Sequence, residues 1–122
     1  MSRLLIVEDQ PDIRRLVRWS LELEPHELHE ASNGAEGLAL ARSVRPDLVL
    51  LDVMMPGDLD GLAVCAQLKA DADLAGVRVV MLTARAQATD RDAALAAGAD
   101  AFLAKPFSPL ELIETIARLL KD

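Results

Sequence analysis

The sequence has few of the residues that mark several large protein classes. Its 122 residues include one cysteine, two phenylalanines, one tryptophan and no tyrosine. A single cysteine excludes an intramolecular disulfide and is typical of proteins from a reducing compartment. Because aromatic side chains are so scarce, Leu, Val, Ile, Ala and Met must fill the interior. This composition favours helices packed on an aliphatic sheet over an aromatic-rich β-sandwich.

Positive charge and long apolar runs are also scarce. The chain has 13 Lys and Arg residues against 20 Asp and Glu residues, a net charge of −7. This balance argues against a general nucleic-acid or anionic-membrane surface, because phosphates attract basic patches. No apolar stretch approaches the roughly 20 residues of a membrane span, and no secretory signal pattern follows Met1. We therefore expect a cytoplasmic protein that binds neither nucleic acid nor membrane directly.

The hydrophobic pattern alternates between short apolar runs and helical periodicity. The runs predict strands at residues 4–7, 27–31, 48–51, 77–82 and 101–103, and the helical segments fall at 11–21, 35–44, 60–70, 88–97 and 108–120. Asp60 is a predicted N-cap, Gly98 a predicted C-terminal helix stop, and Ser108 with Pro109 and Glu111 a predicted capping box. Proline at 46 should end the second helix.

Five strands alternating with five helices predict an α/β fold within a single domain, residues 1–122. Right-handed crossovers would give a three-layer, doubly wound (βα)5 unit with a parallel sheet. Among the few topologies that remain, we favour the strand order 2-1-3-4-5, which is the known order of flavodoxin-like proteins. In such sheets, ligands bind beyond the carboxyl ends of the strands, where the strand order reverses.

Polar residues stand at each of these predicted strand ends. Glu8 and Asp9 follow the first strand, Asp52 the third, Thr83 the fourth and Lys105 the fifth. Each residue alone would ordinarily be a solvated or capping group. Neighbouring strands lie about 4.8 Å apart, so these residues can share one pocket. Three carboxylates and one ammonium leave two negative charges, which a divalent cation would cancel, and an all-oxygen site suits Mg²⁺.

With these residues in place, the sequence resembles the receiver domains of bacterial two-component response regulators. The resemblance covers essentially the whole chain and is carried by LLIVED at 4–9, PDLVLLDVMMPG at 46–57, VVMLTA at 79–84 and GADAFLAKPF at 98–107. It implies a phosphorylation-activated switch in a phosphorelay that is not a turnover enzyme. The expected partners are a sensor histidine kinase or histidine phosphotransfer protein, and a downstream effector.

The resemblance also implies roles for individual residues. Asp52 would be the phosphoacceptor. Asp9, Asp52 and the main-chain carbonyl of Met54 would bind Mg²⁺, or Mn²⁺ as a substitute, with Glu8 helping through water. Lys105 would pair with Asp52 and then with the phosphoryl oxygens.

The remaining implied residues belong to the switch. Thr83 would hydrogen-bond a phosphoryl oxygen, and Phe102 would be the switch aromatic. The peptide bond between Lys105 and Pro106 would be cis. Downstream binding would use the face formed by the fourth helix, fifth strand and fifth helix.

The sequence also departs from the common receiver pattern. The loop 56–61 has one residue more than the usual PGxDG form, and Met54 and Arg85 stand where the family tunes phosphoryl lifetime. A receiver of this kind either stands alone or is the input domain of a longer regulator. Away from the strand ends, Trp19 is expected to pack on the first helix, or, if it is exposed, to mark a partner-contact face. Cys65 is expected to be a small buried hydrophobe in preference to a redox sensor. His26 and His29 are expected to lie away from the site.

Two other functions fit the residues less well than the receiver interpretation. A phosphatase that forms an aspartyl phosphate should carry DxDxT after a strand, whereas this chain reads DVMMP at 52–56. A flavin or nucleotide binder needs a glycine- or hydroxyl-rich turn after the first strand to hold phosphate. That turn here reads EDQPD at 8–12 and is negatively charged.

Overall fold

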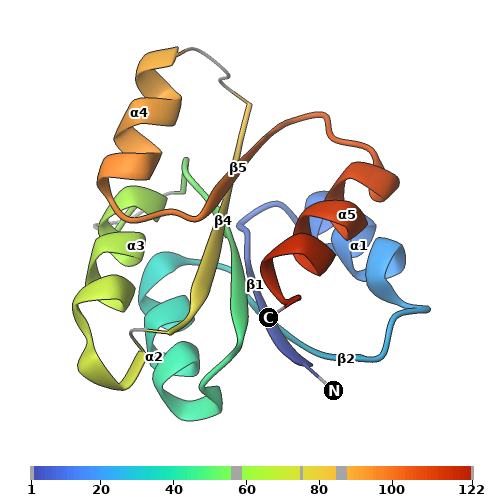
Figure 1. The fold of residues 1–122 in the computed structure, drawn as a ribbon, viewed down its shortest axis with the longest axis horizontal. Helices are drawn as coiled ribbons and strands as arrows, with labels where there is room; N and C mark the ends of the chain where they lie inside the picture. Colours follow the sequence, from blue (N-terminus) through green and yellow to red (C-terminus); the bar gives the residue numbers. More distant parts are fainter. Residues whose placement is uncertain (1, 56–58, 75, 85–87, 122) are drawn as a thin grey trace.

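The computed structural model describes residues 2–55, 59–74, 76–84 and 88–121 and has the predicted alternation of strands and helices (Figure 1). The strands are β1 (Ser2–Val7), β2 (His26–Ala31), β3 (Leu48–Asp52), β4 (Arg78–Thr83) and β5 (Ala101–Ala104). The helices are α1 (Pro11–Leu21), α2 (Gly34–Val44), α3 (Gly61–Ala70), α4 (Ala88–Ala96) and α5 (Pro109–Leu119), with a 3-10 turn at Ala72–Leu74. Among the described residues, the helices are all too short or too polar to cross a membrane.

The five strands form one parallel sheet in the order β2-β1-β3-β4-β5, which confirms the predicted fold. The three inner strands β1, β3 and β4 are apolar almost throughout because both of their faces are covered. One face, with Leu5, Val49 and Val79, packs against α2, α3 and α4. The other, with Leu4 and Leu50, packs against α1 and α5. Figure 1 shows the two helix groups on opposite sides of the sheet.

Capping residues begin or end three of the helices within one or two residues of the positions that the sequence predicts. Asp60 Oδ1 accepts a hydrogen bond from the Ala63 amide at 2.9 Å, and Ser108 Oγ accepts one from the Glu111 amide at 3.0 Å. Gly98 has a φ of 102° at the end of α4, a value that favours glycine. These signals fix the beginnings of α3 and α5 and the end of α4 relative to the sheet.

Of the two alternatives for Trp19, the structure has the exposed one: Trp19 is 65% exposed, because the apolar face of α1 is formed by Val17 and Leu21. The predictions for the longer loop fall largely on residues 56–58, and those for Arg85 on that residue; both lie outside the described residues.

Candidate functional site

The parallel register places the polar strand ends at one edge of the sheet. Val7 pairs with Leu51, and Asp52 pairs with Leu82, so the residues after β1 lie beside the last residue of β3. Thr83 pairs with Ala104, directly before Lys105. The sheet therefore brings together the five positions that the sequence predicts for the site.

The carboxylates of Glu8, Asp9 and Asp52 form one acidic group. One oxygen from each lies within 4.8 Å of the others. Glu8 is fully buried, Asp52 is 3% exposed, and Asp9 is half-buried at the mouth. A cavity of about 170 Å³ opens beside them and is lined by Asp9, Gln10, Asp52, Met54, Ala84 and Lys105. Its position matches the crevice where ligands bind in doubly wound sheets.

Lys105 supplies positive charge to this group. Its Nζ donates a hydrogen bond to Glu8 Oε1 at 2.5 Å and lies 3.4 Å from Asp52 Oδ1. The Lys105 amide donates to the Thr83 carbonyl at 2.6 Å, and the peptide bond to Pro106 is cis. The sequence predicts the pairing with Asp52 but not the closer contact with Glu8.

Glu8 is the carboxyl group most perturbed by this environment. Burial, and then the neighbouring Asp52, raise the pKa of Glu8 to about 8, while Lys105 acts in the opposite direction. Glu8 Oε2 is buried and has no hydrogen-bond partner among the described residues. A buried carboxylate oxygen without a partner is costly, so this atom favours a proton or a cation.

The residues present fit a divalent cation. The donor set consists of carboxylate oxygens from Glu8, Asp9 and Asp52, with the Met54 backbone at the same cavity. Such oxygen ligands suit hard ions such as Mg²⁺ or Mn²⁺. The unpartnered Glu8 oxygen is the specific observation that a cation, directly or through water, would explain.

The backbone around Asp52 is held by close packing. The Val53 amide donates to the Leu82 carbonyl at 2.9 Å, and the Met54 amide donates to Asp52 Oδ1 at 3.2 Å. The first residue of α3, Gly61, lies so close that a Cβ there would be 2.2 Å from the Asp52 carbonyl oxygen. Only glycine allows α3 to approach the end of β3 in this way.

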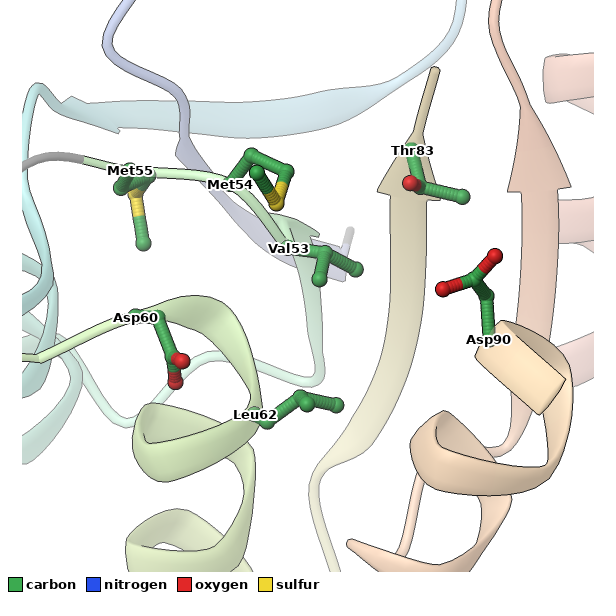
Figure 2. Close-up of a pocket in the computed structure, with 7 residues that line it drawn as sticks. All are labelled: Val53, Met54, Met55, Asp60, Leu62, Thr83 and Asp90. Atoms are coloured by element: carbon green, nitrogen blue, oxygen red, sulfur yellow. The ribbon is translucent and has the colours of Figure 1, made fainter. Parts of the chain in front are cut away.

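A second cavity, of about 550 Å³, is lined by Val53, Met54, Met55, Asp60, Leu62, Thr83 and Asp90 (Figure 2). It meets the acidic cavity at Met54. Figure 2 shows the Thr83 hydroxyl at the end of β4 and the Asp90 carboxylate entering from the first turn of α4. Thr83 lines this second cavity, although it is only 1% exposed.

Phe102 lies on β5 outside the acidic group. It pairs in register with Met81 and is partly buried against the α2–α3–α4 side of the sheet. The Arg91 guanidinium on α4 lies 5.9 Å from the centre of its ring, within cation–π range. The aromatic side chain therefore links α4 to β5 at the predicted switch face.

Other candidate residues lie elsewhere, as expected. His26 and His29 are on β2, and His29 Nε2 lies 2.8 Å from Glu27 Oε2. Cys65 is buried in α3. One contact at the site had no signal in the sequence: Arg14 Nη1 donates to the Glu8 carbonyl at 2.6 Å, and only the packing of α1 beside β1 reveals it.

Known proteins with similar sequences are regulators. The family model described as the response regulator receiver domain matches residues 4–117. The chain is 40% identical over 121 residues to the DNA-binding dual master transcriptional regulator RpaA of Synechocystis, covering 99% of this chain and 50% of the relative. It is 39% identical over 120 residues to the transcriptional regulatory protein ResD of Bacillus subtilis, covering 98% of this chain and 48% of the relative.

Solved structures of similar proteins have the same fold as this chain. The chemotaxis protein CheY4 of Vibrio cholerae superposes with a TM-score of 0.92 at 31% identity, covering 98% of this chain and 99% of that one. The chain thus spans about half the length of the two curated regulators but nearly the whole of this structure. On this evidence the chain belongs to the family of response regulator receiver domains, and it is homologous to two-component transcriptional regulators.

Proposed function

We propose that this domain is a switch operated by phosphorylation of Asp52. The observation that carries the proposal is the convergence of three carboxylates and the Lys105 ammonium on one cavity at the end of β3. Asp52 is the member of the acidic group that combines burial with a position on the wall of that cavity. Family membership supports the same assignment, and supports a signalling switch in place of a turnover enzyme.

The acidic group would hold a magnesium ion, with Mn²⁺ as a substitute. Asp9, Asp52 and the Met54 carbonyl would be its ligands, and Glu8 would contribute through water. When bound, the ion would neutralise negative charge on the transferring phosphoryl group. Mutual repulsion among the three carboxylates explains why the site would select a divalent cation.

Residues of this chain would carry out the phosphoryl transfer. An Asp52 carboxylate oxygen attacks the phosphorus of a phosphohistidine on a partner protein, and the P–N bond breaks as the P–O bond forms. The imidazole leaves with the electron pair of the broken bond. Lys105, already 3.4 Å from Asp52 Oδ1, would move its ammonium onto a phosphoryl oxygen. Positioning and charge supply most of the catalysis in such reactions.

The new phosphoryl group would be read by Thr83 and Phe102. A phosphoryl group adds negative charge and strong acceptor oxygens, which would draw the Thr83 hydroxyl towards Asp52. Movement of Thr83 would free space near the second cavity and allow the Phe102 ring to turn inward from the α4–β5–α5 face. Arg91, which now covers this ring, would then lose that contact. The result is a two-state surface biased by phosphorylation.

The proposed partners follow from this cycle. A sensor histidine kinase or histidine phosphotransfer protein would donate the phosphoryl group, and an effector protein or domain would bind the α4–β5–α5 face. The domain works either alone or as the input unit of a longer regulator. A cytoplasmic location remains a prediction, supported by the unpaired buried thiol of Cys65.

The direct test is labelling by a small acyl-phosphate donor. The wild-type protein should become phosphorylated with Mg²⁺ but not with a chelator, and Asp52→Asn should abolish labelling. Asp60→Asn is the matched control, because Asp60 is exposed and asparagine also caps helices. Undiminished labelling of Asp52→Asn would refute the proposal.

A further inference from the structure

Arg14 reaches the back of the acidic group from α1. Its Nη1 donates to the main-chain carbonyl of Glu8 at 2.6 Å. The Arg14 side chain is 21% exposed, so this charge-assisted hydrogen bond is partly shielded from water. The contact lies outside the cavity that would receive the phosphoryl group, whose lining does not include Arg14.

The guanidinium is held in place by the edge strand. Arg14 Nε lies 3.6 Å from Glu30 Oε1 on β2. The other Glu30 oxygen accepts from Arg18 Nε at 2.6 Å, so one carboxylate bridges two arginines of α1. Arg14 thus contacts Glu8 and Glu30 with different nitrogens, a geometry that a lysine cannot reproduce.

This arrangement fixes the peptide that carries both acidic residues after β1. The Glu8 amide donates to the Ala31 carbonyl at 3.1 Å, while Arg14 holds the Glu8 carbonyl. The Glu8 carbonyl and the Asp9 amide belong to one planar peptide unit. Holding that carbonyl therefore fixes the direction in which the backbone presents Asp9, and the fully buried side chain of Glu8 beside it.

We propose that Arg14, braced by Glu30, is a positioning residue for the divalent-cation site. The proposal rests on the proposed function, because it concerns the same acidic group. Arg14 touches neither the phosphoacceptor nor the cavity, and it acts through the backbone of Glu8 and Asp9. Loss of an outer partner of a metal ligand commonly weakens metal binding by 10–100-fold.

The direction of the change in Mg²⁺ affinity after substitution of Arg14 distinguishes a positioning role from a simple effect of its charge. Arg14 is a cation near a cation site, so removal of its charge alone should tighten Mg²⁺ binding. Removal of a positioning contact should weaken it. Arg18 is the matched control, because it also pairs with Glu30 from α1 but is not a partner of the Glu8 carbonyl.

The experiment compares wild type, Arg14→Met, Arg14→Lys and Arg18→Met. Mg²⁺ would be titrated while the amide NMR signals of Asp9 and Met54 are followed. Amide hydrogen exchange of Glu8 would be measured in the metal-free proteins, and urea unfolding would report global stability. We expect Arg14→Met to weaken Mg²⁺ binding about tenfold and to speed Glu8 exchange. Arg14→Lys should lie between Arg14→Met and wild type, and Arg18→Met should match wild type.

The outcomes are distinguishable. Unchanged or tighter Mg²⁺ binding in Arg14→Met, or an equal loss in Arg18→Met, overturns the positioning role while leaving the proposed function intact. If Arg14→Met does not fold, Arg14→Lys decides: wild-type Mg²⁺ binding and Glu8 exchange in that variant overturn the role. A wild-type protein that does not respond to Mg²⁺ overturns both the site and its positioning residue.

Discussion

Lys105 lies closer to Glu8 than to the proposed phosphoacceptor. Its Nζ is 2.5 Å from Glu8 Oε1 and 3.4 Å from Asp52 Oδ1, and its side chain is 13% exposed. One half-buried ammonium therefore faces two buried carboxyl groups, of which Glu8 has the raised pKa. In a protein without bound metal, this contact is the main electrostatic support of the site.

Replacement of Lys105 by methionine should destabilise the metal-free protein by about 2 kcal/mol at pH 8. This is less than the roughly 3–5 kcal/mol typical of a broken buried pair, because Glu8 can take up a proton. Mg²⁺ binding should be retained or tightened, since a competing cation has gone, while acyl-phosphate labelling should fall. Urea unfolding and Mg²⁺ titration measure these effects. Lys121→Met, at an exposed lysine, is the control, and an equal loss of stability there would contradict the interpretation.

The raised pKa of Glu8 predicts a pH-dependent stability of the metal-free protein. In the folded state the pKa of Glu8 is about 8, against 4.5 for an unperturbed glutamate. Between these values the folded state holds a proton that the unfolded state has released. Stability should therefore fall as pH rises from about 5 to about 8 and then level off.

Urea unfolding in a chelator at several pH values tests this dependence. Glu8→Gln should flatten the profile, because the amide does not titrate. The matched variant Glu111→Gln, at an exposed position, should keep the wild-type slope. A slope that Glu8→Gln leaves unchanged would contradict the raised pKa of Glu8.

Gly61 should be intolerant of any side chain. A Cβ would lie 2.2 Å from the Asp52 carbonyl oxygen and 2.7 Å from Val53 Cα, and neither backbone atom can move away cheaply. We expect Gly61→Ala to lower the free energy of unfolding by about 3 kcal/mol, at the upper end for overpacking. It should also weaken Mg²⁺ binding by displacing Asp52.

Gly76→Ala is the matched control for this substitution. Among the described residues, no atom lies within 4 Å of its added Cβ, and its φ is not in the left-handed region. The alanine there should leave stability unchanged or raise it by up to about 1 kcal/mol, because it restricts the unfolded chain. Chemical denaturation of both variants would decide, and similar effects at the two positions would refute the packing argument.

Cys65 should be chemically silent in the native protein. Burial raises the pKa of its thiol to about 11, and its Sγ donates to the Ala97 carbonyl at 3.4 Å. Because the folded pKa exceeds the usual value of 9.0, ionisation should oppose folding between about pH 9 and 11. Alkylation at pH 8 should follow opening of the α3–α4 region and accelerate with urea. Rapid alkylation under native conditions would contradict this burial.

Local chemistry made several elements predictable. Asp60, Gly98 and Ser108 mark helix ends that depend on the residue itself and its nearest neighbours, and each lies where expected. The continuous apolar runs of β1, β3 and β4 are required of strands covered on both faces. The favoured packing of Trp19 was not found, and its exposed alternative was, because the helical period of α1 does not reveal which apolar side chains have a neighbour.

The sequence by itself determined the alternation of strands and helices and the polar residues at the strand ends, because both follow from local periodicity and from parallel pairing. Tertiary structure alone decided that Lys105 hydrogen-bonds Glu8 and lies farther from Asp52. It also decided that Gly61 packs on the Asp52 carbonyl and that Arg14 hydrogen-bonds the backbone of Glu8. These contacts join residues on different elements. Their distances depend on how the helices pack against the sheet, and that packing is a property of the whole core.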